Sequence, residues 1–269
     1  MTAVQPDAAI AGATLAGKVA LITGSGNLKG IGRGIAEALA AEGAGVVINY
    51  ASRPEEAEIV AGQLRERGTD VLMCRADISE LGQVEDMFAA ILEHFGRLDV
   101  LVNNAGVCVW EELVDLSAAG FDRMTDVNIL GTFACSRRAA TAMVERGIRG
   151  RIINIASGHA RRPMPLMSGY GATKAAIDHL SQSLALELAP YGITVNQLWP
   201  GFVDTDINGE KPELATDEGR RALLATIPIG AAATPADLGA AAVYLAGPAG
   251  DKVTGAILKI DGGQHIRCI

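Results

Sequence analysis

The sequence contains few cysteines and no excess of positive charge. Only 4 of its 269 residues are cysteines, and they stand neither at the spacing of metal ligands nor in the pattern of a disulfide framework. We therefore expect reduced thiols and no metal site. The formal net charge of -8 argues against a nucleic-acid-binding protein, because neutralising phosphates requires clustered lysines and arginines.

Long hydrophobic runs are also missing. Apolar stretches such as residues 238–250 fall short of the roughly 20 residues needed to cross a bilayer, and residues 1–17 lack the basic flank of a signal peptide. We therefore expect a cytoplasmic protein that acts on a small molecule and has no membrane partner. Hydrophobic residues make up 49% of the chain, enough for a large core. No linker divides the sequence, so we expect a flexible N-terminus at 1–15 and one domain at 16–269.

Short runs of β-branched residues alternate with longer helical patterns along the chain. This alternation is typical of an α/β fold with a doubly wound parallel sheet and helices on both faces. We expect seven strands, at 19–23, 45–50, 70–75, 98–103, 151–156, 193–198 and 256–261. We expect helices at 54–67, 81–95, 117–146 and 171–189, and after the cap Thr234. Residues 207–233 interrupt the pattern as a substrate lid or a surface excursion, and we favour the lid.

A glycine-rich segment, TGSGNLKGIGRGIAEALA at 23–40, lies where the first strand passes into a helix. Glycine lets the backbone approach a pyrophosphate closely, and a helix N-terminus supplies free N–H groups and a positive dipole end. The segment therefore predicts a dinucleotide phosphate loop. Its spacing is unusual, since five residues separate Gly24 from Gly30.

The end of the second strand indicates which cofactor this loop holds. A site that prefers NAD(H) usually carries an acid there to bind the ribose 2'-hydroxyl, whereas residues 49–53 read NYASR. Lys29 and Arg53 can pair with a 2'-phosphate, so we favour NADP(H) and keep NAD(H) as possible. In the alternative interpretation, both cations are solvated surface residues.

A serine, a tyrosine and a lysine follow the fifth strand at a characteristic spacing. Ser157, Tyr170 and Lys174 stand as Ser-x12-Tyr-x3-Lys. Tyr170 and Lys174 share one face of a helix because they are four residues apart. An ammonium group beside a phenol lowers the pKa of the phenol toward the working pH, as a general acid–base requires. The spacing therefore predicts proton transfer at the Tyr170 hydroxyl.

Further motifs extend this pattern in a fixed order. They are TGSGNLKGIG at 23–32, ADI at 76–78, NNAG at 103–106, DVNILGT at 126–132, PGFVDT at 200–205 and DGG at 261–263. With them, the chain resembles the short-chain dehydrogenase/reductase family from about residue 15 to 263. The resemblance implies a single Rossmann-type domain, NAD(P)-dependent oxidation or reduction at CH–OH groups, and a homotetramer. In register with the family, Thr23 and Gly24 keep their usual positions, so two extra residues enlarge the phosphate loop.

The resemblance also assigns roles to single residues. Tyr170 exchanges a proton with the substrate oxygen, Ser157 orients that oxygen, and Asn128 holds a water that joins Lys174 to solvent. The expected catalytic residues are Asn128, Ser157, Tyr170 and Lys174. The expected cofactor-binding residues are Gly24, Ser25, Asn27, Lys29, Gly30, Ile31, Tyr50, Ser52, Arg53, Asp77, Ile78, Asn104, Ala105, Gly106, Tyr170, Lys174, Pro200, Gly201, Val203 and Thr205.

Substrate contacts are expected from residues near the serine and tyrosine and after NNAG. The expected substrate-binding residues are Trp110, Ser157, His159 and Met164. Further candidates are Met167 and Trp199. Each of these side chains apart from Ser157 could instead be a packing residue. Arg161 and Arg162 could attract an anionic substrate, but we favour an exposed pair solvated by water.

We expect hydride transfer between NADP(H) and the carbonyl group or secondary alcohol of a small polar or cyclic substrate. Motifs that include GH at 158–159 and IPIG at 227–230 are similar to bacterial glucose 1-dehydrogenases, so sugar oxidation with NAD(H) or NADP(H) is one alternative. Reductases of acyl-carrier-protein thioesters typically carry an arginine where this chain has Leu186, which weakens that reading. A dinucleotide sensor without turnover is the alternative from another class. The intact serine, tyrosine and lysine argue against it.

Overall fold

Seven parallel strands form one sheet in the order β3-β2-β1-β4-β5-β6-β7. The computed structural model describes residues 14–203, 205 and 216–267. The strands are β1 (Val19–Ile22), β2 (Gly45–Tyr50), β3 (Val71–Arg75), β4 (Val100–Asn103), β5 (Arg151–Ile155), β6 (Thr194–Pro200) and β7 (Ile257–Ile260). The seven strands expected from the β-branched runs are confirmed. The strand order reverses between β1 and β4, which is where folds of this class bind their ligands.

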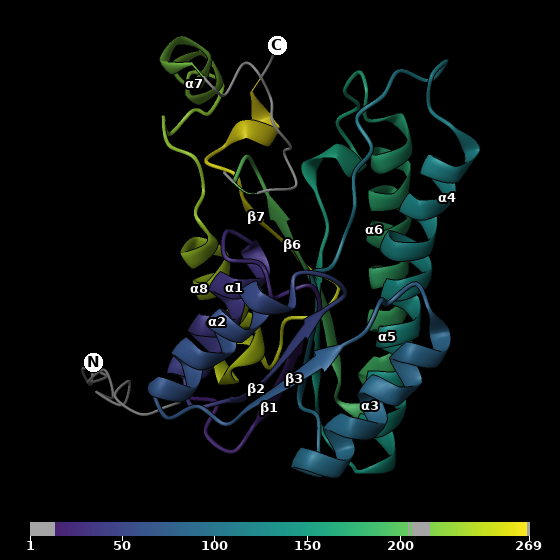
Figure 1. Cartoon of the computed structure of the whole chain (residues 1–269), viewed down its shortest axis with the longest axis vertical. Coiled ribbons are helices and arrows are strands. Elements are labelled where there is room, and N and C mark those ends of the chain that lie inside the picture. The colour runs from purple at the N-terminus through teal and green to yellow at the C-terminus, as the bar shows by residue number, and fades with distance from the viewer. Residues whose placement is uncertain (1–13, 204, 206–215, 268–269) are drawn as a thin grey trace, which may run out of the picture.

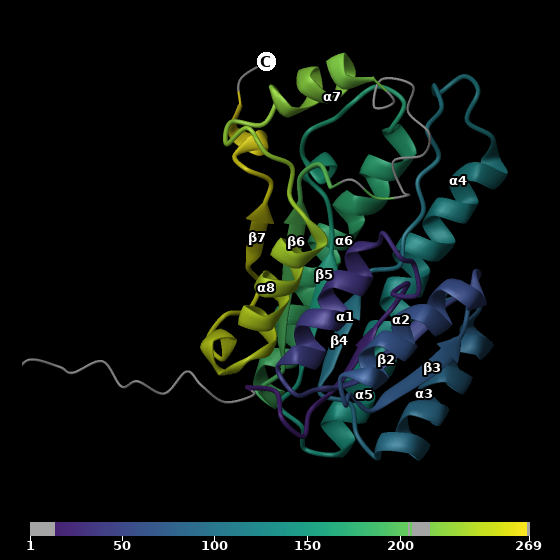
Figure 2. The same cartoon turned by 60° about the vertical axis from the view of Figure 1, so that its left-hand side comes forward.

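Helices cover both faces of the sheet (Figure 1). One face carries α1 (Ile31–Ala41), α2 (Pro54–Glu66) and α8 (Pro235–Ala246). The other carries α3 (Leu81–Phe95), α5 (Thr132–Glu145) and α6 (Ser168–Leu188). Two shorter helices, α4 (Ala118–Thr125) and α7 (Asp217–Leu224), lie toward the end of the molecule where the strands terminate (Figure 2). The doubly wound α/β fold is therefore confirmed.

The core consists of two apolar layers, one on each face of the sheet. Successive side chains of a strand point to opposite faces, and β1 shows this directly. Ala20 and Ile22 join the cluster under α1 and α8, whereas Val19 and Leu21 join the cluster under α3 and α5. All four side chains are almost fully buried. A central strand buried on both faces explains why the run VALI reads as continuously hydrophobic.

The long helix expected at 117–146 is interrupted. A π-helical segment, Asp126–Gly131, lies between α4 and α5. Inside it, the Asn128 side-chain oxygen accepts from the Val107 N–H at 2.9 Å, and the Asn128 amide donates to the Val107 carbonyl at 2.9 Å. These bonds join the wider turn to the chain after β4. Such π-helical turns are frequent at functional sites.

The two ends of the described chain are both held by contacts. Leu15 is only 2% exposed and its N–H donates to the Glu42 carbonyl, so the folded part begins before residue 16, where the sequence placed it. At the other end, the turn Gln264–Ile266 contacts residues that follow α7. The Gln264 amide donates to the Thr226 hydroxyl at 3.3 Å, and the Arg267 guanidinium donates to the Ala225 carbonyl.

Part of the expected lid lies outside the described residues, which do not include 206–215. The described part contains α7, whose N-cap Thr216 accepts a hydrogen bond from the Gly219 N–H. Within the described ranges, no helix is both long and apolar enough to span a bilayer. The lid and the cytoplasmic location both stay predictions.

Candidate active site

The expected site residues gather along the edge of the sheet where the parallel strands end. Gly24 follows β1, Asn104 follows β4 and Ser157 follows β5. Tyr50 is the last residue of β2, and Pro200 is the last residue of β6. Parallel strands present their carboxyl ends at the same edge, so motifs far apart in the sequence meet there.

Ser157, Tyr170 and Lys174 lie together and are almost completely buried. Tyr170 is 8% exposed and Lys174 is 4% exposed. The Ser157 hydroxyl lies near enough to the Tyr170 hydroxyl to lower its pKa. The Lys174 Nζ lies 5.5 Å from the centroid of the Tyr170 ring and donates to the Ile155 carbonyl at 2.9 Å. The arrangement therefore places a hydroxyl pair and an ammonium group in one desolvated site.

Burial has the largest influence on the pKa values of Tyr170 and Lys174. It raises the pKa of Tyr170 above its ordinary value, and a charge on the nearby Cys108 raises it further, while the Ser157 hydroxyl lowers it. Burial also lowers the pKa of Lys174 to about 8, against a small opposing effect of Cys108. The expected lowering of the tyrosine pKa is therefore not found in the chain by itself, because desolvation outweighs the other effects.

We expect the buried Lys174 to make folding stability depend on pH. Between its folded pKa of about 8 and the ordinary lysine pKa of 10.5, the unfolded chain binds more protons, so the free energy of unfolding rises with pH. The slope is at most about 1.4 kcal/mol per pH unit. Denaturant unfolding of the wild type and Lys174→Met, from about pH 7 to about pH 10, measures it. A difference between the two that stays constant with pH would contradict the lowered pKa.

Asn128 and Gly106 complete the surroundings of the lysine. Asn128 is fully buried, and its amide also donates to the Thr173 hydroxyl at 3.0 Å. A Cβ atom added to Gly106 would stand 3.3 Å from the Asn128 side-chain oxygen and 3.7 Å from the Lys174 Nζ. The polar atoms of the Asn128 side chain thus bind protein groups, and the water assigned to this residue stays a prediction.

A buried polar network supports the site and was missed by the sequence reasoning. The Asn103 amide donates to the Asn154 side-chain oxygen at 2.8 Å and to the Ser136 hydroxyl at 2.9 Å. The Asn154 amide donates in turn to the Ser181 hydroxyl at 2.8 Å. The network joins β4, β5, α5 and α6, which carry or adjoin the expected catalytic residues. Polar residues inside otherwise apolar strands were the available signal, because buried amides require partners.

The glycine-rich segment forms a close turn between β1 and α1. Gly24 has a φ of +63°, and a Cβ atom there would stand 2.9 Å from the Ala105 Cα. A Cβ atom on Gly32 would stand 2.5 Å from the Asn104 side-chain nitrogen. The N-cap of α1, Gly30, provides no side-chain hydrogen bond. The first turn of α1 therefore keeps backbone N–H groups that can donate hydrogen bonds to a phosphate.

Buried side chains fix the shape of this turn. Asn49, which had no role assigned to it at the end of the second strand, accepts from the Gly24 N–H at 3.0 Å and donates to the Ala76 carbonyl at 3.0 Å. The Asn104 amide donates to the Gly24 carbonyl at 3.1 Å. Ser25 was expected to bind cofactor, but it is fully buried and its hydroxyl donates to the Ile22 carbonyl. Ser25 therefore helps to hold the loop from within.

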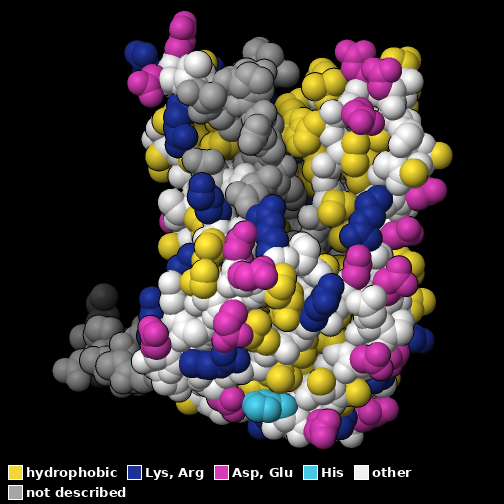
Figure 3. Space-filling model, viewed as in Figure 1, with side chains coloured by type: hydrophobic (Ala, Val, Ile, Leu, Met, Phe, Trp, Pro, Cys, Tyr) yellow, Lys and Arg dark blue, Asp and Glu magenta, His cyan; other side chains and the backbone are white. Residues whose placement is uncertain are grey.

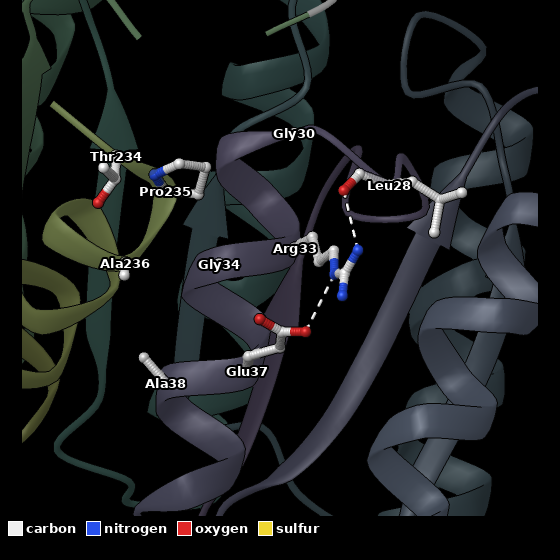
Figure 4. A pocket seen from close by; sticks show the side chains of 9 residues that line it. All are labelled: Leu28, Gly30, Arg33, Gly34, Glu37, Ala38, Thr234, Pro235 and Ala236. Carbon is white, nitrogen blue, oxygen red and sulfur yellow. Dashed lines mark hydrogen bonds and ion pairs between the residues drawn. The ribbon is translucent and has the colours of Figure 1, made fainter. Parts of the chain in front are cut away.

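The enlarged part of the loop is also held. The Arg33 guanidinium donates to the Leu28 carbonyl at 2.9 Å and to the Glu37 carboxylate at 3.0 Å (Figure 4). The Lys29 N–H donates to the Asn27 side-chain oxygen at 2.8 Å, while the Lys29 side chain is exposed. A groove of about 480 Å³ lies beside these residues, between α1 and the start of α8. None of the expected catalytic residues lines this groove.

Two residues after β3, Asp77 and Ile78, were expected to bind the cofactor. Asp77 forms an ion pair with Arg123 of α4 at 2.9 Å and accepts from the Ser79 hydroxyl at 2.6 Å. Burial raises the pKa of Asp77, but the hydrogen bonds from Ser79 and Arg123 outweigh it and hold the pKa below its usual value. Ile78 is 3% exposed and packs against the π-helical Gly131. Asp77 thus lies at the expected edge with protein partners of its own.

The expected substrate residues divide into two groups. Met167 is buried beside Tyr170, and Trp110 packs against the same cluster. The His159 N–H donates to the Ser157 hydroxyl oxygen, so His159 also lies at the site. Trp199, by contrast, is 3% exposed in the core cluster with Ile177, and its ring lies under the Arg161 guanidinium at 5.2 Å. It is a packing residue.

The two arginines of this loop are not simply solvated, contrary to the favoured interpretation. Arg161 forms an ion pair with Asp178 at 2.8 Å in addition to its contact with Trp199. The Arg162 guanidinium donates to the Gln264 carbonyl. The two arginines therefore tie the loop between Ser157 and Tyr170 to α6, to β6 and to the C-terminal turn.

Comparisons with known proteins identify the family of the chain. A family model described as enoyl-(acyl carrier protein) reductase matches residues 24–265. The 3beta-hydroxysteroid dehydrogenase 1 of Eggerthella lenta is 40% identical over 252 residues, which cover 94% of this chain and 95% of that protein. The chain belongs to the short-chain dehydrogenase/reductase family.

Two further members of the short-chain dehydrogenase/reductase family show how broad the likeness is. The glucose 1-dehydrogenase 2 of Bacillus subtilis is 36% identical over 94% of this chain and 96% of its own length. A solved structure of a gluconate 5-dehydrogenase from Burkholderia cenocepacia, in complex with NADP and tartrate, is 33% identical. The match covers 95% of this chain and 98% of the gluconate 5-dehydrogenase chain, with a TM-score of 0.88.

This short-chain dehydrogenase/reductase is an NAD(P)-dependent oxidoreductase, and its phosphate loop fits a dinucleotide. A side chain at Gly24 would collide with Ala105, and one at Gly32 would collide with Asn104, so only glycine permits this close turn. The start of α1 presents backbone N–H groups without a side-chain cap, which suits a pyrophosphate. Gly24, Gly30 and Ile31 would hold that group. A bound nicotinamide supplies the donor or acceptor of hydride.

Proposed function

We propose that the chain is a carbonyl reductase or secondary-alcohol dehydrogenase that prefers NADP(H) and acts on a small polar or cyclic substrate. The observation that carries the proposal is the burial of Ser157, Tyr170 and Lys174 in one cluster, with the Lys174 Nζ 5.5 Å from the centroid of the Tyr170 ring. Such a desolvated cluster at the carboxyl edge of a sheet is a suitable place for proton transfer to a substrate oxygen. The same cluster argues against a sensor without turnover.

Each side chain has one task in the proposed reaction. The raised pKa of Tyr170 keeps its phenol protonated near neutral pH, the form that donates to a carbonyl oxygen in reduction. In oxidation, the same phenol oxygen must first lose its proton to accept one from the alcohol. The Ser157 hydroxyl orients the substrate oxygen. Lys174 supplies a positive charge that stabilises the phenolate formed when Tyr170 has given its proton away.

The cofactor preference rests on the end of β2 and on the phosphate loop. Tyr50 ends β2, and no carboxylate follows it before Arg53, so nothing at this position binds a ribose 2'-hydroxyl as an acid would. Lys29 is exposed, and the Arg53 side chain is 52% exposed. Two cations near the adenosine side of the loop support binding of a 2'-phosphate. The NADP complex of the Burkholderia relative is in line with this choice.

Apolar side chains around the site favour a cyclic substrate with an apolar face over a polar sugar. Leu113 and Val114 are 77% and 86% exposed on the loop after β4, and Met164 and Leu166 are 39% and 42% exposed on the loop before α6. The Glu111 N–H donates to the Leu166 carbonyl at 3.2 Å, so the two loops lie side by side. Figure 3 shows hydrophobic side chains gathered at this end of the molecule. Apolar rims of this kind are typical of sites for apolar ligands.

Activity measurements with both cofactors test the proposal. Purified protein is assayed with NADP(H) and NAD(H) against steroid alcohols and ketones, smaller cyclic ketones, glucose and gluconate. We expect turnover of cyclic substrates that have an apolar face. Preferred oxidation of glucose would support the second candidate, to which the 36% identity with glucose 1-dehydrogenase 2 lends weight. Binding of cofactor without turnover of any substrate would support the sensor alternative.

We also propose that four copies assemble, as the family resemblance implies. The faces of α5 and α6 that turn away from the sheet carry exposed apolar side chains, among them Phe133, Val144 and Leu186. Exposed side chains of this kind suit contacts between copies of one chain related by two-fold axes. We expect light scattering at micromolar concentration to give about four times the 27.9 kDa chain mass. A stable monomer would contradict the assembly.

A further inference from the structure

Glu56 connects the enlarged phosphate loop to Arg53. It lies in the first turn of α2, and its side chain is 29% exposed. One carboxylate oxygen accepts from the Leu28 N–H at 3.1 Å, and the other lies 3.4 Å from an Arg53 guanidinium nitrogen. Leu28 belongs to the enlarged part of the loop, and its carbonyl is bound by Arg33. The loop is therefore held from both sides, by α1 and by α2.

Arg53 itself has an unusual backbone. It is the N-cap of α2 and has a φ of +58°, a left-handed conformation that costs free energy for a residue with a side chain. Pro54 follows at the first position of α2. A fixed backbone and an ion pair with Glu56 together limit where the guanidinium can go. Its position is thus set partly by the carboxylate.

The charge of Glu56 acts on any phosphate that reaches Arg53. A carboxylate 3.4 Å from the guanidinium offsets part of its positive potential and repels a second anion nearby. A ribose 2'-hydroxyl carries no charge and does not experience this repulsion. Glu56 therefore weakens the binding of a 2'-phosphate more than the binding of a 2'-hydroxyl.

We propose that Glu56 is a specificity-determining residue that limits the preference for NADP(H) and keeps NAD(H) acceptable. This inference rests on the proposed cofactor site. The charge of Glu56 beside Arg53 limits the preference for NADP(H), while the second carboxylate oxygen anchors the loop at Leu28. The two tasks can be separated, because glutamine keeps an acceptor for the Leu28 N–H and removes the charge.

Binding of two cofactor fragments tests the proposal without any turnover. Calorimetric titration with 2',5'-ADP and with 5'-AMP gives the affinity ratio that the 2'-phosphate contributes. We expect Glu56→Gln to raise this ratio about three- to tenfold at low salt, and the gain to shrink at high salt. Glu55→Gln is the matched control, because Glu55 is exposed and carries the same charge one residue earlier. It should raise the ratio less than Glu56→Gln does.

A second variant tests the anchor. Glu56→Ala removes the acceptor as well as the charge, and we expect it to weaken the binding of both fragments. If Glu56→Gln leaves the ratio unchanged, or changes it no more than Glu55→Gln, the inference is wrong although the cofactor site stands. If the wild type binds neither fragment, the proposed function fails and the inference fails with it. Melting temperatures of all variants show whether they fold as the wild type does.

Discussion

Replacing Tyr170 with phenylalanine is expected to abolish most turnover and to leave cofactor binding nearly intact. The variant keeps the ring that packs among Met124 and Met167 but removes the hydroxyl beside Ser157. Loss of a positioned acid–base group lowers the rate by a factor of roughly 10² to 10⁴. The measurement compares kcat of both proteins with the preferred substrate, and cofactor affinity by fluorescence titration.

The control for this result is Tyr191→Phe. Tyr191 follows the end of α6 and is 55% exposed, so the same chemical change there should leave kcat unaltered. Substantial activity in the Tyr170 variant would refute its catalytic role. A loss of cofactor binding equal to the loss of kcat would mean that the hydroxyl holds the cofactor rather than transferring a proton.

The second large effect is expected from Lys29→Ala/Arg53→Ala. A charge-assisted hydrogen bond contributes about 1.5 to 3 kcal/mol, and both side chains are exposed, so solvent screening reduces their share. We still expect kcat/KM with NADPH to fall at least about tenfold more than kcat/KM with NADH, which corresponds to about 1.4 kcal/mol. The 2'-hydroxyl of NADH offers no negative charge to either cation. Both constants are measured for the wild type and the double variant.

A matched double variant separates this local effect from the change in net charge. Arg67→Ala/Lys252→Ala also removes two exposed cations, one at the C-terminal end of α2 and one beyond α8. It should leave the cofactor preference as it is. An unchanged preference in Lys29→Ala/Arg53→Ala, or a wild type that prefers NADH outright, would show that the enlarged loop serves another purpose.

Local patterns were enough to predict most of the fold. The run VALI predicts β1 because a strand buried on both faces is apolar throughout, and Thr234 followed by Pro235 predicts the start of α8. The spacing of Ser157, Tyr170 and Lys174 likewise places them on one strand end and one helix face. Each of these features depends on neighbours within a few turns of the chain.

Features that depend on contacts between distant segments could not be read from the sequence. The pKa of Tyr170 is set by burial under loops that the spacing does not describe. Asn49 looks like an ordinary strand residue until β1 and β3 bring Gly24 and Ala76 to its side chain. The same holds for Arg162, whose partner Gln264 is 102 residues away. Sequence spacing shows on which face of a helix or strand a residue lies, but it does not show which elements contact one another.

The contacts of the C-terminal turn have a practical consequence for handling the protein. Gln264 binds Arg162 and Thr226, and Arg267 binds the Ala225 carbonyl. An affinity tag at the C-terminus would therefore follow closely in the chain after residues that hold the loop preceding Tyr170. The described chain begins at Thr14, whose hydroxyl donates to the Glu42 carboxylate just ahead of β2, at the edge of the sheet where the strands begin. Purification through the N-terminus is therefore the choice that leaves the catalytic face undisturbed.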